Sequence, residues 1–110
     1  MSEAPTDSAG KRLRKVREAV GLTQADFATK LNIKVHQVKN IEYGTSRIPE
    51  EVFAEIGRLM PELLPWVVYG GKVSLEQLEQ SKSDFCKLLV VRIDIGLVAD
   101  APFLDIRDGN

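Results

Sequence analysis

Apolar residues recur at helical spacing along the first part of the chain. Leu13, Val16 and Val20 follow the i, i+3, i+7 pattern of an amphipathic helix, and Gly21 is suited to end it. The same periodicity, punctuated by helix start and stop signals, predicts further helices up to residue 70. The predicted helical segments are residues 9–20, 23–32, 34–43, 49–60 and 62–68.

The signals between the second and third helices are the most specific. Thr23 and Asp26 occupy capping-box positions at the start of the second helix. Asn32 is suited to end that helix, because asparagine tolerates a left-handed backbone better than most residues. Only about two residues then precede the third helix, which stops at Gly44. So short a connection predicts a helix-turn-helix.

The second part of the chain is less regular. Residues 74–82 begin with a capping box and predict a helix. Residues 90–97 alternate and are rich in β-branched side chains, so we expect a strand there, although residues 85–92 also fit a helix. An irregular tail is expected from Ala101. The predicted fold is mainly α, with a flexible leader (1–8), a five-helix domain (9–70) and a C-terminal extension (71–110).

Charge is distributed unevenly between the two parts. The 110 residues carry a net charge of -1, but residues 11–47 carry +6 and residues 48–110 carry -5. A basic first part is typical of a module that faces a polyanion, and an acidic second part could cover a protein partner. A solvated charged surface would explain the same charges without any ligand. The position of the basic residues in the fold must therefore distinguish a ligand-binding surface from an ordinary solvated one.

The third predicted helix has an unusual polar face. At ~100° of rotation per residue, Val38 and Ile41 point toward the core. The opposite face carries His36, Lys39, Asn40 and Tyr43, with Val35 at its edge. It holds no carboxylate, because Glu42 points nearer the core side. Such a face suits the major groove of DNA, where asparagine can pair with adenine and lysine with guanine.

The segment LTQADFATKLNIKVHQVKNIEYG resembles the XRE/Cro-type helix-turn-helix family of phage repressors and bacterial regulators. The resemblance spans about residues 9–61 and rests on several features at fixed spacing. These are the Leu-Thr-Gln start, the small Ala28, the apolar set Ile33, Val38 and Ile41, and the Ile-Glu-x-Gly ending. It implies a repressor-like DNA-binding domain of bacterial or phage origin that acts on double-stranded DNA as a homodimer.

The resemblance also implies roles for single residues. Bases would be read by Val35, His36, Lys39 and Asn40, and phosphates would be contacted by Gln24, Lys34, Tyr43 and Arg47. Arg17 and Glu42 match a structural pair that ties the first helix to the third. The basic first helix would lie beside the DNA backbone. Lys34 replaces the usual small N-cap, which costs about 1 kcal/mol, and Asn32 replaces the usual turn glycine.

Apolar residues beyond residue 62 exceed what a five-helix domain needs, so we expect dimerisation there, through Trp66, Leu88, Val91, Ile93 and Ile95. His36 and Cys86 are the only histidine and cysteine, and no glycine-rich phosphate loop follows a strand. We therefore expect no enzyme activity, no metal and no cofactor. The sequence shows neither a secretory signal nor a membrane span, so a cytoplasmic location is expected.

Two other classes of function stay open. The chain could be the DNA-binding antitoxin of a toxin–antitoxin pair, with its acidic second part covering a basic toxin. It could also be a helix-turn-helix adaptor that binds protein instead of DNA.

Overall fold

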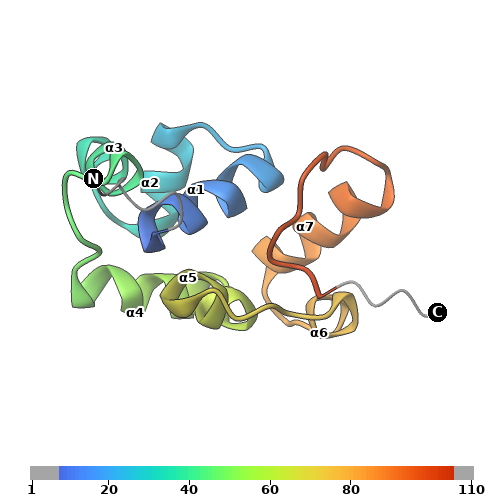
Figure 1. The fold of residues 1–110 in the computed structure, drawn as a ribbon. Helices are drawn as coiled ribbons and strands as arrows, with labels where there is room; N and C mark the ends of the chain where they lie inside the picture. Colours follow the sequence, from blue (N-terminus) through green and yellow to red (C-terminus); the bar gives the residue numbers. More distant parts are fainter. Residues whose placement is uncertain (1–7, 106–110) are drawn as a thin grey trace, which may run out of the picture.

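The computed structural model describes residues 8–105, which form seven α-helices and one 3-10 helix. These are α1 (Ala9–Val20), α2 (Gln24–Leu31), α3 (Val35–Tyr43), α4 (Glu50–Leu59), η1 (Pro61–Leu63), α5 (Leu64–Tyr69), α6 (Leu75–Glu79) and α7 (Asp84–Asp94). Figure 1 shows α3 and α7 at opposite ends of the molecule. The mainly α class predicted from the sequence is confirmed. The predicted leader, apart from Ser8, lies outside the described residues.

The signals at the ends of α2 work as the sequence predicts. The Thr23 hydroxyl accepts a hydrogen bond from the Asp26 N–H at 3.0 Å. Asn32 has φ 59° and ψ 39°, and is the one non-glycine residue with positive φ between residues 8 and 105. Asparagine therefore takes the left-handed position that glycine fills at the end of α3, where Gly44 has φ 83°.

The start of α3 shows how the missing N-cap is handled. Lys34 makes no side-chain capping bond. Instead, Gln37 reaches back, and its Oε1 accepts from the Lys34 N–H at 2.9 Å. This is the second half of a capping box, so one of the unpaired N–H groups at this end is satisfied after all.

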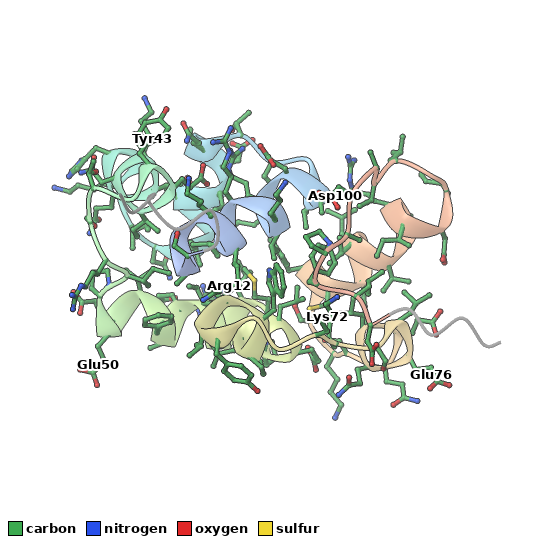
Figure 2. The ribbon with its side chains drawn as sticks, viewed as in Figure 1. Arg12, Tyr43, Glu50, Lys72, Glu76 and Asp100 are labelled. Carbon is green, nitrogen blue, oxygen red and sulfur yellow. The ribbon has the colours of Figure 1, made fainter. Side chains whose placement is uncertain are left out.

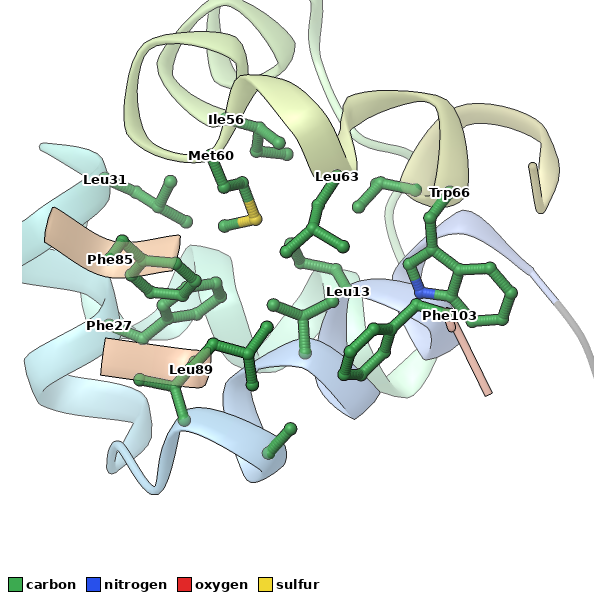
Figure 3. Close-up of a cluster of buried hydrophobic side chains, with 14 of the residues drawn as sticks. Leu13, Phe27, Leu31, Ile56, Met60, Leu63, Trp66, Phe85, Leu89 and Phe103 are labelled. Atoms are coloured by element: carbon green, nitrogen blue, oxygen red, sulfur yellow. The ribbon is translucent and has the colours of Figure 1, made fainter. Parts of the chain in front are cut away.

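One hydrophobic core joins the first five helices to the C-terminal part (Figure 3). Phe27 of α2 packs against Phe85 of α7, with ring centroids 6.1 Å apart. Trp66 of α5 meets Phe103 edge to face at 6.3 Å. The residues after position 70 therefore supply large side chains to the same core on which α3 rests.

The strand expected over residues 90–97 is wrong, because α7 extends through Asp94. The N-cap of the helix is Ser83, whose hydroxyl accepts from the Cys86 N–H at 3.3 Å. Phe85 and Leu89 recur at helical spacing and are buried, with 5% and 0% exposure. No strand is available within residues 8–105 to pair with this segment, so burial of the helical face outweighs the β-branched alternation.

The segment after α7 returns to the body of the molecule. The Val73 N–H donates to the Phe103 carbonyl, and the Asp105 N–H donates to the Val73 carbonyl, each at 2.8 Å. Val73 and Leu104 thereby form an isolated parallel bridge. The tail expected from Ala101 is irregular as far as residue 105, but Phe103 is fully buried and fixes it to the core.

The helix expected over residues 74–82 is shorter than predicted and ends at Glu79. Beyond it, Ser81 is buried and its hydroxyl donates to a carboxylate oxygen of Glu62 at 2.7 Å. This tertiary bond draws the chain out of the helix toward η1.

Three arginines join helices through carbonyl groups near helix C-termini. Arg12 donates from Nε and Nη2 to two carbonyls at the end of α5, each at 3.1 Å. Arg58 donates to the end of α2 at 2.8 Å, and Arg92 donates to the end of α1 at 2.9 Å. These carbonyls have no intrahelical partner, and the negative end of the helix dipole favours a cation there. Part of the basic charge is therefore structural.

Candidate nucleic-acid interface

Helix α3 is fixed by an ion pair to α1. Glu42 has 2% exposure, and its two carboxylate oxygens accept from Arg17 Nε at 2.6 Å and Nη2 at 3.0 Å. The Arg17 Nη1 also donates to the Leu22 carbonyl at 2.8 Å. The structure thus contains the structural pair that the family resemblance implies. A bidentate arginine–carboxylate pair restricts orientation as well as distance, so it fixes how α3 is turned on α1.

Gln24 completes this cluster. Its side-chain amide donates to the Glu42 Oε1 at 3.0 Å. The sequence placed Gln24 among the phosphate contacts, but in the structure its side chain is half-buried and engaged with α3. The only carboxylate of α3 is therefore fully hydrogen-bonded and neutralised on the inner side of the helix.

The outer side of α3 is exposed and polar. The side chains of His36, Lys39 and Asn40 are exposed and form no hydrogen bond or ion pair within residues 8–105. Tyr43 is 62% exposed and points away from the body of the molecule (Figure 2), and Val35 is 39% exposed at the edge of the same face. The face offers unused donors and acceptors from one rigid helix.

The turn after α3 is tied to the helix end. The Asn40 carbonyl accepts from the Thr45 N–H at 3.0 Å, from the Ser46 N–H at 3.2 Å and from the Thr45 hydroxyl at 3.2 Å. Arg47 follows with an exposed side chain. Thr45 is a residue of this site that was not predicted, although a threonine directly after a helix-ending glycine is a signal for such a bond.

Three exposed basic side chains without an ion pair lie in or beside α3, and five lysines elsewhere in residues 8–105 are also exposed and unpaired. Within residues 8–105, Lys34, Lys39 and Arg47 are exposed and make no ion pair. Lys34 precedes the helix, Lys39 lies in its middle and Arg47 follows its end. Lys39 therefore adds a cation to the exposed polar face, and Lys34 and Arg47 add one near each end of the helix.

The basic face expected for α1 is largely used inside the molecule. Of its five basic side chains, Arg12 and Arg17 turn inward. Arg14 pairs with Glu18 at 3.0 Å, and Lys15 pairs with Asp100 at 3.3 Å. Lys11 is exposed. The +6 charge of the first part therefore overstates the charge that α1 offers to a ligand. The two inward arginines are neutralised or hydrogen-bonded by carboxylate and carbonyl groups of distant segments, as a buried charge requires.

The residues expected to form a dimer surface are divided between core and surface. Trp66 is 7% exposed, and its Nε1 donates to the Arg12 carbonyl at 3.2 Å. Its side chain therefore packs within its own chain and is not exposed to a second copy. Ile93 is half-buried against the core. Leu88 and Val91 are exposed on α7, and Ile95 is exposed directly after its last residue.

Residues 12–55 match the model of a family described as a helix-turn-helix domain. The match begins in α1 and ends inside α4, so it includes the whole α2–turn–α3 unit. It supports a helix-turn-helix family without distinguishing the XRE/Cro type. Comparison with curated proteins and with solved structures found no match. Between residues 8 and 105, no helix is long and apolar enough to cross a membrane.

Proposed function

We propose that the chain is a sequence-specific regulator of transcription that binds double-stranded DNA through the major groove. One observation carries the proposal: α3 presents exposed, unpartnered polar side chains and one cation on one face, while its only carboxylate is buried and paired with Arg17. A carboxylate on that face would be repelled by phosphate. Its withdrawal to the inner side leaves a face suited to a polyanion.

The side chains on this face match the chemistry of base edges. Asn40 can form a bidentate pair with adenine, in which its amide N–H donates to N7 and its Oδ1 accepts from the N6 amino group, and Lys39 can donate to the acceptors of guanine. Val35 can contact the methyl group of thymine, and His36 adds a further donor or acceptor. In this proposal Val35, His36, Lys39 and Asn40 read sequence.

Phosphate contacts would surround this set. Lys34 and Arg47 flank α3 and are exposed, and Tyr43 presents its hydroxyl on the same side. Gln24 remains a proposed phosphate contact only because it lies at the N-terminus of α2. Its side-chain amide already donates to Glu42. Such contacts position the protein on the duplex and make the affinity depend on salt.

The proposed mode of action is that of an XRE/Cro-type repressor. A homodimer in the cytoplasm would bind a two-fold related operator whose half-sites are spaced by one helical turn, about 34 Å, or a multiple of it. The resemblance in the segment from Leu22 to Gly44 supports this assignment. Catalysis, metal and cofactor have no part in the proposal.

A second candidate is a helix-turn-helix protein that binds another protein, either as an adaptor or as the antitoxin of a toxin–antitoxin pair. The exposed apolar residues of α5 favour it, since Val68 is 46% and Tyr69 71% exposed. An adaptor that works without DNA would not bind any duplex even at low salt, whereas an antitoxin would bind both DNA and a basic protein.

Selection of binding sites from random duplex DNA tests the proposal. The expected result is enrichment of one short sequence with two-fold symmetry. Absence of any enriched sequence, together with no binding to random duplex at low salt, would contradict it and favour the adaptor.

A further inference from the structure

Helix α7 carries an apolar strip on its outer side. Leu88, Val91 and Ile95 follow i, i+3, i+7 spacing and are 44%, 53% and 63% exposed. Ile95 is the C-cap of the helix, and its N–H donates to the Val91 carbonyl at 3.0 Å. The other side of the helix is buried through Phe85 and Leu89. Large apolar side chains grouped in this way on an exposed helix mark an interaction surface.

Opposite charges border this strip on one side. Lys87 and Asp94 lie seven residues apart, so at ~100° per residue they project within ~20° of each other from α7. Both are exposed, and neither forms an ion pair within residues 8–105. The opposite side of the strip leads to Arg92, which is engaged with the carbonyl of Ala19.

We infer that α7 packs antiparallel against α7 of a second copy of this chain. In a two-fold antiparallel pair, the same side of each helix faces the same side of its partner with the direction reversed. Lys87 of one copy then lies opposite Asp94 of the other, and the reciprocal pair forms by symmetry. The apolar strips meet between them, with Val91 near the two-fold axis.

Two features favour a second copy of this chain as the partner of α7, and favour the antiparallel orientation. Lys87 and Asp94 lie toward the two ends of one side of α7. When two such sides face each other, opposite charges meet only if the two helices run antiparallel. A parallel pair would place Lys87 and Asp94 opposite the flank of Arg92, which α1 already occupies. The surface therefore fits a second copy in the antiparallel orientation.

The arrangement leaves α3 free in both copies, because α3 and α7 lie at opposite ends of the molecule (Figure 1). This inference specifies the interface of the proposed homodimer. It rests on the proposed function, since a two-fold symmetric protein matches a two-fold symmetric operator. A single helix pair is a small interface, so the dimer forms with rising concentration in the absence of DNA and is not obligate.

Charge exchange tests the pairing. Sedimentation equilibrium without DNA is measured for the wild type and for the variants Lys87→Glu, Asp94→Lys and Lys87→Glu/Asp94→Lys. Each single reversal sets like charges opposite each other at both symmetric positions, and weakens dimerisation by about tenfold. The double reversal restores it. An equimolar mixture of the two single variants forms a heterodimer, followed with one variant labelled by a fluorophore. Lys72→Glu, an exposed change outside α7, leaves the dimer unchanged.

Circular dichroism and a urea melt establish that each variant is folded, so a misfolded variant cannot imitate a weakened dimer. The inference is overturned if the wild type stays monomeric at every concentration, if Val91→Asp leaves the dimer intact, or if the mixture associates no better than the single variants. These outcomes are read without DNA. Failure of the proposed function appears separately, as absence of duplex binding in any oligomeric state.

Discussion

Gly10 of α1 lies directly against the backbone of Ile41 in α3. A Cβ added at Gly10 would stand 2.0 Å from the Ile41 carbonyl oxygen, far inside van der Waals contact. The neighbour is backbone, which cannot rotate away as a side chain could. This close approach and the Arg17–Glu42 pair together fix the position of α3 against α1.

Gly10→Ala should therefore destabilise the protein by about 1–3 kcal/mol, although alanine is the better helix former. The free energy of unfolding in urea measures it. Gly57→Ala in α4 is the matched control, because its Cβ would meet only a side-chain methyl of Leu64 at 3.5 Å. That change should stabilise by about 0.5–1 kcal/mol. Equal effects of the two substitutions would contradict the close packing of α1 on α3.

Loss of the Glu42 carboxylate should be severe. Glu42→Ala leaves Arg17 half-buried without its bidentate partner and is expected to cost about 3–5 kcal/mol. Glu18→Ala removes an ion pair of similar length from an exposed site, where both side chains are about half exposed, and should change stability by less than about 1 kcal/mol. Urea unfolding of the two variants compares them. Similar losses would show that burial of the pair does not matter.

Alkaline pH should weaken the fold through Cys86. Burial raises the pKa of the Cys86 thiol, and hydrogen bonds from Ser81 and Ser83 only partly oppose this. Since the folded pKa lies above the unfolded one, the stabilisation is complete below the unfolded pKa, about 8.5, and is lost progressively as pH rises from there through the folded pKa. Wild type should therefore lose more stability than Cys86→Ala between about pH 7 and about pH 10. Parallel losses in urea unfolding would remove Cys86 as the cause.

Arg47→Ala should weaken binding to selected and random duplex DNA alike. If Arg47 meets a phosphate, the slope of log affinity against log salt should fall by about 1. Lys72→Ala is the control, because Lys72 and Tyr43 lie on opposite sides of the molecule (Figure 2), and it should leave the slope unchanged. A loss confined to the selected sequence would instead make Arg47 a base contact.

Local signals in the sequence predicted local structure well. Thr23, Asn32 and Gly44 act within a few residues of themselves, and each stands where its chemistry is needed. The outward polar face of α3 could be predicted for the same reason, because helical rotation alone separates Val38 and Ile41 from Asn40.

Features that depend on distant segments could not be predicted. Arg12 looks like surface charge until α5 brings carbonyl groups beside it, more than fifty positions along the chain. The segment from residue 90 alternates like a strand, but no neighbouring strand exists in the described part of the chain, and burial of Phe85 decided for a helix. Phe103 gave no periodic signal at all.

Asn40→Ala tests most directly whether the outer face of α3 reads DNA sequence. The measurement is the affinity of wild type and variant for the duplex enriched by site selection and for a scrambled duplex at one fixed salt concentration. If Asn40 reads a base, the variant loses about 1–3 kcal/mol on the selected duplex only, with relaxed preference at one base pair. Equal losses on both duplexes, or no loss on either, would contradict it.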